Sequence, residues 1–362
     1  MTAGIFSNSG AKPYPWLFHP LVDLFFCCGG LFWLLVALHF KFNAPGQALN
    51  QSLPYETVLL LAGSVLFSNP HVSATLLRLY SKKETRNRLW FHSYLSLIFF
   101  TLLVGASLSN TFLLALLIRL YASLTFDHTI SQNYGITLMY CYRSGFLLEN
   151  KERLCLKVIH HSLTWFSILR QFTYIEFCPK KHLGFTIPML GPIPEIFTWT
   201  ALSVLILSSI CFLAILARKA VKEGRHMPLP AYFLLFTSVI MFTAGVEISG
   251  GFFLFTPAFF HAAQYLVVAT YYNLKESGQT ENVRPENMIR LLFSGANLKY
   301  YFGLLGLGTM VFALAPFAIS LFGVSFTAAW AAIFVCGGFH HFLADSALWK
   351  LRDARVREAI LN

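Results

Sequence analysis

Long apolar runs separated by short polar stretches dominate the chain. A helix needs about 20 apolar residues to cross a bilayer. The pattern therefore predicts an all-α fold: a polytopic integral-membrane helical bundle of about ten transmembrane helices, forming a single domain over residues 1–362. The predicted helices are 21–40, 55–80, 90–109, 111–142, 154–176, 195–217, 229–249, 251–274, 299–322 and 326–349.

Three of these segments are less uniform than the others. Segments 55–80, 111–142 and 154–176 each change between apolar and polar character along their length. Such a change is expected where a helix end lines a cavity inside the protein. Segment 154–176 could instead lie at the membrane interface, and eight crossings remain if 111–142 and 154–176 both re-enter.

The Lys and Arg residues predict the orientation of the chain in the membrane. They cluster in alternate connections, whereas most of the connections between those clusters carry little charge. Because basic residues concentrate in cytoplasmic loops, we expect both termini in the cytoplasm, as a short segment 1–20 and a tail 350–362. The basic clusters lie within 78–88, 143–157, 218–225, 275–299 and 350–357.

Composition supports a membrane protein and excludes several other classes. Only 12% of the residues are charged, against about 25% in soluble domains. The net charge of +11 is explained by basic loops, and no basic run is long enough to predict a nucleic-acid partner. The seven cysteines contain no C-x-x-C pair, so neither a disulfide scaffold nor a structural zinc site is indicated.

Histidines supply the candidate chemistry. His71, His128, His261 and the pair His340-His341 lie on four of the predicted helices, at roughly 10–20 Å from the cytoplasmic helix ends at about 1.5 Å per residue. They therefore share one leaflet. Ionisable residues inside a membrane are costly and mark functional sites by default, so we expect these side chains to meet.

The local spacing gives three of these histidines a polar neighbour. Gln132 lies one turn after His128, Gln264 lies three residues after His261, and Asp345 lies one turn after His341. A metal-bound imidazole usually donates its second N–H to such a group. Gln132, Gln264 and Asp345 are therefore predicted as outer or alternative ligands of a catalytic site.

Neutral imidazoles with few carboxylates suit iron, zinc or copper rather than magnesium or calcium. We expect Fe²⁺, with zinc or copper less favoured, because iron with an open position can activate O₂. The predicted ligands are His71, His128 and His261 with one or both of His340 and His341. Adjacent helical residues diverge by about 100°, which favours one of the pair, and the Asp345 neighbour favours His341.

A second metal ion is a further possibility. His160 and His161 on segment 154–176 could hold it, and the site would then be dinuclear. The H-x-x-x-H and H-x-x-H-H spacings of membrane desaturases and hydroxylases are absent, which weakens that variant.

These motifs resemble one known family. His19-Pro20-Leu21-Val22-Asp23 precedes a glycine-containing first helix, Pro70-His71 lies late in the second, and His340-His341 with Asp345 lies in the last. With the His128 and His261 helices, this arrangement resembles the bacteriorhodopsin-related Brp/Blh family of membrane β-carotene dioxygenases and its uncharacterised bacterial relatives.

The resemblance implies a multi-pass protein of the bacterial inner membrane with a histidine-bound non-haem iron. It also implies that the protein cleaves a carotenoid or other apolar lipid substrate with O₂. The family's Pro-His is followed by Gly-Ala and then an Asp, whereas residues 72–75 here read Val-Ser-Ala-Thr. The residues therefore support the prediction of iron binding better than the prediction of carotenoid cleavage.

Two other functional hypotheses use the same histidines. A multi-pass transporter could employ them as a proton or metal pathway, with Glu247 as a proton-carrying acid. A haem protein of the electron-transfer kind needs histidine pairs on facing helices. Haem would leave the other histidine-bearing helices unexplained.

Overall fold

The computed structural model describes residues 14–42, 61–174, 181–244, 256–281, 283–351 and 353–361. Nearly all of these residues are helical, and the sheet they contain is a two-stranded hairpin that pairs β1 (Lys181–His182) with β2 (Phe185–Thr186). The predicted all-α class is confirmed. Glu247 lies outside the described residues.

Within the described ranges the predicted apolar segments are largely helical, and residues 55–60, 175–176, 245–249 and 251–255 of these segments lie outside those ranges. Segment 21–40 is broken into two pieces, and 299–322 runs through two regular helices with a wider π-helical turn between them. The bounds are α1 Pro20–Val22, η1 Asp23–Cys27, α2 Gly30–Phe42, η2 Ser64–Ser68, α4 Asn69–Tyr80, α5 Lys83–Arg88, η3 Phe91–Leu95, α6 Ser96–Ser109, α7 Thr111–Arg143, α8 Asn150–Thr173, α9 Glu195–Glu223, α10 Leu229–Thr243, α12 Thr256–Glu276, η6 Pro285–Phe293, α13 Gly295–Thr309, η7 Met310–Leu314, α14 Ala315–Ser320, α15 Phe326–Leu348 and α16 Ala354–Leu361.

Fewer than ten of the described helices are, each by itself, long and apolar enough to cross a membrane. Within the described ranges, five are long and apolar enough, and the pair Pro20–Cys27 and Gly30–Leu38, bent by 63°, could form a sixth. The figure of ten is therefore not confirmed. The five are Phe91–Ser109, Thr111–Arg143, Glu195–Glu223, Gly295–Ser320 and Phe326–Leu348.

The shortfall has a physical reason. Helices α4, α8 and α12 carry many polar or charged residues, and a large share of them is buried against other helices. Such helices need no continuous apolar surface, because their neighbours shield them. The long apolar helices and the overall helical content are compatible with an integral membrane protein.

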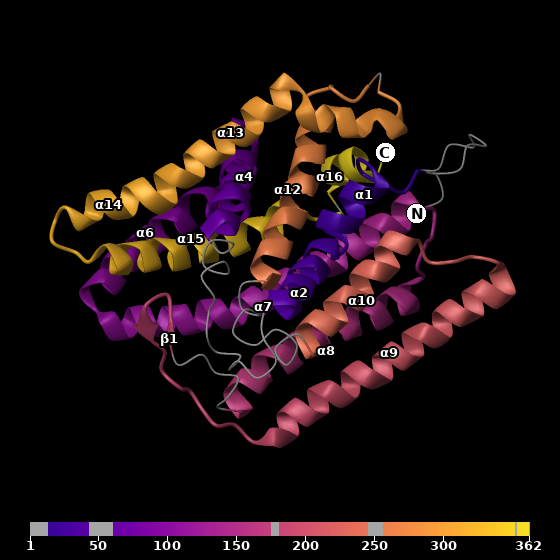
Figure 1. Ribbon diagram of the computed structural model, residues 1–362, viewed down its shortest axis with the longest axis horizontal. Helices are drawn as coiled ribbons and strands as arrows, with labels where there is room; N and C mark the ends of the chain where they lie inside the picture. The colour runs from indigo at the N-terminus through magenta and orange to yellow at the C-terminus, as the bar shows by residue number, and fades with distance from the viewer. Residues whose placement is uncertain are drawn as a thin grey trace.

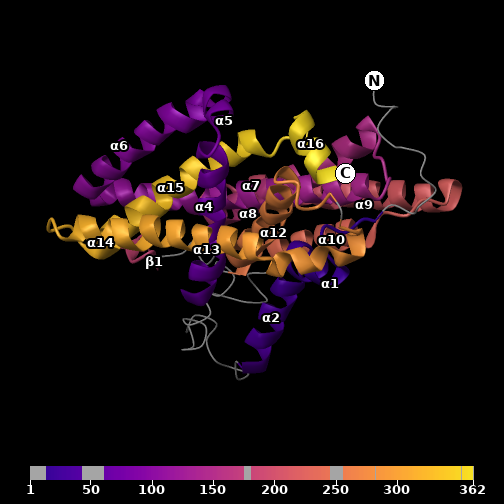
Figure 2. The same ribbon diagram turned by 90° about the horizontal axis from the view of Figure 1, so that it is seen from above.

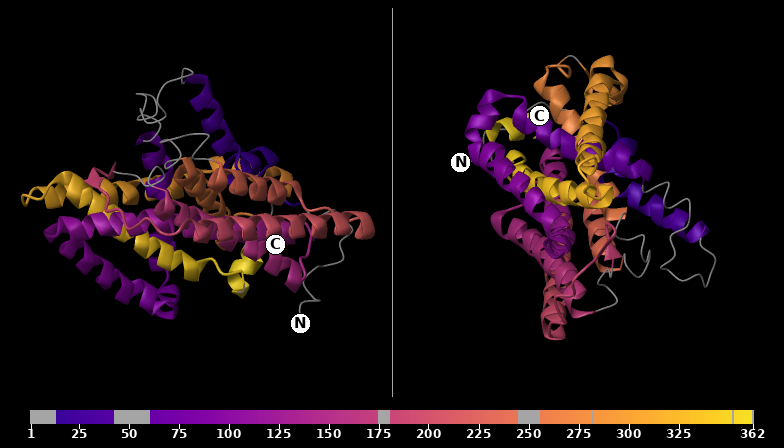
Figure 3. Two further views of the ribbon diagram at one scale, coloured as in Figure 1. Left: turned by 90° about the horizontal axis from the view of Figure 1, so that it is seen from below. Right: turned by 90° about the vertical axis from the view of Figure 1, so that its left-hand side faces the viewer.

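Figure 1 shows the arrangement of the helices. Helix α9 runs along one edge, and α13 with α14 runs along the opposite edge. Helices α4, α7, α12 and α15 lie between these edges and contact one another. Helix α2 projects from the body of the bundle (Figures 2 and 3). The four central helices carry the candidate site.

Sequence signals explain several helix ends. The Asn110 side chain accepts a hydrogen bond from the Leu113 amide and begins α7, as its residue type favours. Glu149 and Glu152 form a reciprocal capping box at the start of α8. Gly224 ends α9 in the left-handed conformation, with φ of 62°.

The bend before α2 depends on a glycine. Gly29 has φ of 116°, which L side chains rarely adopt, and a Cβ there would overlap the Thr237 side chain of α10. The Trp33 indole donates to the same Thr237 hydroxyl at 3.1 Å. The bend thus holds η1 against α10.

The segment His19–Asp23 has a structural role. Buried Asp23 accepts hydrogen bonds from the amides of Leu17 and Phe18 and from the Tyr140 hydroxyl of α7. The His19 ring accepts from the Leu21 amide. These contacts hold residues 17–23 against α7.

Candidate metal centre

Four histidines from four helices meet inside the bundle. His71 of α4, His128 of α7, His261 of α12 and His341 of α15 each offer a ring nitrogen, and these nitrogens all lie within 4.8 Å of one another. Three of the four residues are at most 5% exposed. The predicted convergence of helices on this point is present in the structure.

Each of the four imidazole rings lies next to two of the others, so that the contacts close into a cycle. The centroid distances are 4.2 Å from His71 to His341, 4.9 Å from His341 to His128, 4.7 Å from His128 to His261 and 4.8 Å from His261 to His71. Adjacent rings are steeply inclined to one another. Nitrogens on such rings can point at a common centre, which stacked rings cannot do.

Two of the four histidines have ring nitrogens without another described partner. The Nε2 atom of His71 and both ring nitrogens of His261 are buried and have no hydrogen-bond partner among the described residues. Burying an unpaired polar atom costs roughly 1–3 kcal/mol. Coordination to one cation would satisfy His71 Nε2 and one of the two His261 nitrogens.

The remaining two histidines face each other directly. Their Nε2 atoms, on His128 and His341, lie 3.2 Å apart. Two imidazole nitrogens that bind one ion at about 2.1 Å with tetrahedral angles are separated by about 3.4 Å. The observed distance therefore fits two ligands of one ion, and the donor set suits iron, zinc or copper.

Hydrogen bonds orient two of the rings. The Nδ1 atom of His341 lies 2.8 Å from the Thr75 hydroxyl, and Thr75 in turn donates to Asp345 Oδ1 at 2.8 Å. This path assigns the proton of His341 to Nδ1 and leaves Nε2 free for a metal. His71 forms a hydrogen bond with the main chain of Ser68. Because the Nε2 atom of His71 has no described partner, this bond uses its Nδ1 atom.

The proline before His71 leaves one backbone carbonyl without its helical partner. Pro70 has no N–H to give to the carbonyl of Leu66, and the Tyr301 hydroxyl of α13 donates to that carbonyl at 2.7 Å. The turn Ser64–Ser68 is π-helical. Irregular backbone therefore leads directly into the ligand-bearing turn.

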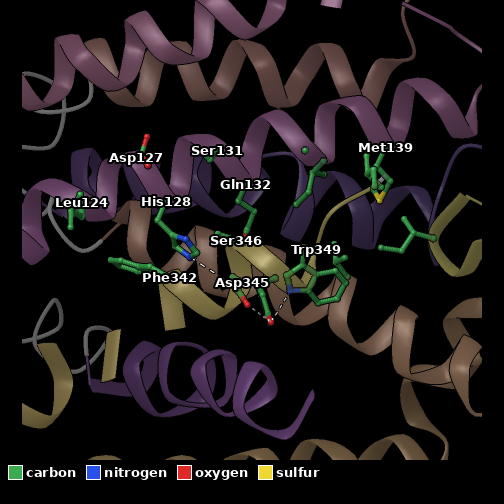
Figure 4. A pocket seen from close by; sticks show the side chains of 16 residues that line it. Leu124, Asp127, His128, Ser131, Gln132, Met139, Phe342, Asp345, Ser346 and Trp349 are labelled. Carbon is green, nitrogen blue, oxygen red and sulfur yellow. Dashed lines mark hydrogen bonds and ion pairs between the residues drawn. The ribbon is translucent and has the colours of Figure 1, made fainter. Parts of the chain in front are cut away.

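Asp345 supplies the carboxylate beside the histidines. Its Oδ1 accepts hydrogen bonds from Thr75 and from Tyr265 at 3.0 Å, and the Trp349 indole donates to Tyr265 at 3.0 Å. Its Oδ2 lies 3.5 Å from His341 Nε2 and 3.9 Å from His128 Nε2. Figure 4 shows Asp345 next to His128 and Trp349. Asp345 thus lies beside two of the four imidazoles.

The two glutamines have different neighbours from those expected. The Gln132 amide donates to the His261 carbonyl at 3.1 Å and to Gln264 Oε1 at 2.6 Å, and Gln264 donates to the Cys27 carbonyl at 2.6 Å. Neither amide has a hydrogen bond with an imidazole ring among the described contacts. The pair joins α7, α12 and η1, because amide groups inside a bundle readily satisfy one another.

His340 lies apart from the cluster. Its Nε2 atom is 3.1 Å from the His92 carbonyl and 3.4 Å from the Tyr80 hydroxyl. Because adjacent residues on α15 point about 100° apart, the ring that faces α6 cannot also face α12. Of the two candidates, the structure brings only His341 to the cluster.

His160 and His161 also lie outside the cluster. The His160 Nδ1 atom lies 2.8 Å from the Leu156 carbonyl, and its ring is 5.2 Å from that of Tyr134. His161 is exposed on the other side of α8. In the part of the chain that the structure describes, the four-histidine cluster is the one group of three or more His, Cys, Asp or Glu side chains close enough to share a metal ion. The expected second ion at His160 and His161 has no shared site.

Two contacts at this site were missed from the sequence. Thr75 and Tyr265 both bond Asp345, and each follows a cluster histidine by four residues on its own helix. Each of the four histidines thus has such a partner position one turn later. The residues are Thr75 after His71, Gln132 after His128, Tyr265 after His261 and Asp345 after His341. This repeated spacing could have identified them.

A mainly apolar cavity of about 350 Å³ adjoins the cluster. His128 and Asp345 lie on its wall, and Phe342 stacks on the His128 ring at 4.3 Å. The exposed side chains of Leu124 and Asp127 belong to the same lining, so the cavity opens beside α7 (Figure 4). The other apolar lining residues are Ile136, Met139, Val268, Leu351 and Ile360.

Comparison of the chain with protein-family models, with curated proteins and with solved structures finds no significant match.

Proposed function

We propose that the protein is a membrane oxygenase in which His71, His128, His261 and His341 hold one non-haem iron ion. The proposal rests on one observation: four imidazoles from four helices offer nitrogens within 4.8 Å of one another. Several of those nitrogens have no other partner. When bound, the iron would supply the activation of O₂.

The cavity indicates the class of substrate. Its walls are mainly apolar, and its volume of about 350 Å³ lies at the lower end of the range for small-molecule sites. A carotenoid or other long lipid would place the reacting part of its chain here and leave the remainder between α7 and α15. Phe342 and Met139 would exclude water, and His128 would lie at the boundary between substrate and metal.

Membrane placement completes the proposal. A substrate of this kind dissolves in the bilayer and would enter from lipid. Both termini would lie in the cytoplasm, with the protein in a bacterial inner membrane, in keeping with the distribution of Lys and Arg. The predicted partners are O₂, membrane lipid and the apolar substrate.

Metal analysis tests this proposal directly. We expect detergent-purified protein to contain close to one iron per chain and to show no haem Soret band. If iron is lost during purification, Co²⁺ added to the apoprotein is expected to give the visible bands of a tetrahedral or five-coordinate ion. Protein that binds none of Fe²⁺, Co²⁺ or Zn²⁺ would contradict the metal assignment.

A glycine in the cavity wall allows a test of the substrate site alone. Gly135 of α7 lines the cavity, and a Cβ there would meet no heavy atom within 4 Å. We expect Gly135→Leu to fill the cavity, to abolish O₂ uptake stimulated by an added polyene such as β-carotene, and to leave metal content unchanged. Replacing a mid-helix glycine also removes a cost of about 0.5–1 kcal/mol, so Tm should not fall.

Gly105→Leu is the matched control for Gly135→Leu. Gly105 is an exposed glycine of α6 with similarly open surroundings, and it lines none of the described cavities. It should retain full activity. Equal activity in the two variants would show that the substrate does not use this cavity.

A proton pathway is the second candidate. It is favoured by the hydrogen-bonded path from His128 through His341 and Thr75 to Asp345. Proteoliposomes with an internal pH dye would distinguish the two functions. A proton flux in metal-free protein would support the pathway, whereas the oxygenase should leave the internal pH unchanged.

A further inference from the structure

A second cavity lies on the other side of Trp349. Its volume is about 230 Å³, and its wall is formed by the ends of α4, α12 and α15 with α5, α13 and α16. Trp349 lines both this cavity and the apolar one beside the histidines. The two cavities differ sharply in chemistry, because charged residues crowd the second.

The second cavity has an excess of positive charge. Two acids oppose its four basic residues, which are Arg78, Lys82, Arg88 and Arg355. Glu276 pairs with Lys82 at 2.7 Å, and Asp353 pairs with Arg88. The hydrogen bond from Arg88 lowers the pKa of the Asp353 carboxyl, so that carboxyl is ionised at neutral pH. Each acid is therefore already matched to one base.

The other two bases have weak partners or none. Arg355 lies 3.7 Å from Glu84 at the rim, where both side chains are more than half exposed, and such pairs contribute little. Arg78 has no carboxylate within ion-pair distance among the described residues. Asp345 and Glu276 act on its charge from a longer distance, and Arg78 is the base of this cavity that has no direct ion pair with a described residue.

Arg78 is nevertheless held rigidly. Its guanidinium carbon lies 3.7 Å from the ring centroids of both Tyr272 and Trp349, and Nη2 donates to the Leu348 carbonyl at 3.3 Å. Its Nη1 is buried and has no hydrogen-bond partner among the described residues. A planar guanidinium fixed by aromatic faces, with donors to spare, is suited to binding a phosphate.

We propose that this cavity binds an anionic phosphate group, held by Arg78 and Arg355. Ser81 and Thr85 also line the cavity and supply hydroxyl donors for the remaining phosphate oxygens. The group could belong to a lipid headgroup or to a free phosphate, which share this chemistry. The proposal is independent of the metal and of the oxygenase function.

The experiment separates the two sources. The full chain is placed in nanodiscs of phosphatidylcholine alone and titrated with inorganic phosphate. In a second arm, phosphatidylglycerol replaces part of the phosphatidylcholine. Tm is measured in both arms, and native mass spectrometry counts retained phosphatidylglycerol. A rise of Tm with phosphate assigns a free ligand, whereas a rise only with phosphatidylglycerol, with lipid retained, assigns a headgroup.

Variants test whether the rise of Tm and the retention of lipid arise from binding in this cavity. We expect Arg78→Gln and Arg355→Gln to weaken binding roughly 10–100-fold, as loss of one charged hydrogen bond implies. Arg355 is largely exposed, so its variant should fold even if Arg78→Gln does not. Arg290→Gln is the control, because that exposed residue lines none of the described cavities.

Two results would overturn the site. One is no change of Tm and no retained lipid in either arm. The other is an equal loss in the Arg355 and Arg290 variants, which would show general attraction to surface charge.

Discussion

His341→Ala is expected to abolish metal binding, and His340→Ala is expected to leave it intact. The His341 ring lies against both His71 and His128, with its Nε2 atom 3.2 Å from that of His128. The His340 ring bonds the His92 carbonyl instead. Loss of even an outer partner typically costs 10–100-fold in metal affinity, so loss of a ligand should cost about 100-fold or more.

The two variants make a matched pair, because they remove the same group from adjacent positions of one helix. Iron content and the visible spectrum of the Co²⁺-loaded protein are the measurements. His340→Ala should retain the wild-type spectrum. If both variants lose metal equally, the loss reflects a general disturbance of α15. If His341→Ala retains metal, His341 is not a ligand.

Asp345→Asn is expected to weaken metal binding about 10–100-fold while the protein remains folded. The substitution keeps an oxygen that can accept from Thr75 and Tyr265, whose hydroxyls now bond Oδ1. It removes the negative charge on Oδ2, which lies 3.5 Å from His341 Nε2. A cation held by four neutral imidazoles would lose its nearest carboxylate.

Titration of the apoprotein with Co²⁺ measures this effect, and the Co²⁺ spectrum reports on geometry in a way that stability does not. Asp127→Asn is the control, because it removes an exposed carboxylate one residue before His128 from the same cavity wall. Unchanged Co²⁺ affinity in Asp345→Asn would limit Asp345 to accepting hydrogen bonds. Thr75→Val should give a smaller loss, since it frees the His341 ring but keeps the charge.

Much of the candidate site could be predicted from single helices. His71, His128 and His261 were expected to meet because their positions along apolar segments gave them similar depths, and the structure brings their nitrogens together. The choice of His341 followed from its spacing to Asp345. Both inferences need only the rise and turn of a helix, which vary little between proteins.

Two sets of candidate residues have neighbours other than those expected. Gln132 and Gln264 were expected beside imidazoles, but they bond each other across α7 and α12. His160 and His161 were assigned to one site, yet they point to different sides of α8. The glutamines bond each other between two helices, about which helical spacing carries no information, whereas His160 bonds the Leu156 carbonyl of its own helix.

The sequence by itself determined the apolar helices, their order and the histidines that share a depth, because burial in lipid or protein imposes a local pattern on each segment. Only the tertiary structure decided how many helices are shielded by neighbours rather than by lipid. It also decided which hydroxyls support the site: Thr75 contacts Tyr265 across 190 residues and Asp345 across 270. Such contacts depend on how each helix is rotated about its axis, and that rotation is set by the packing of the whole bundle.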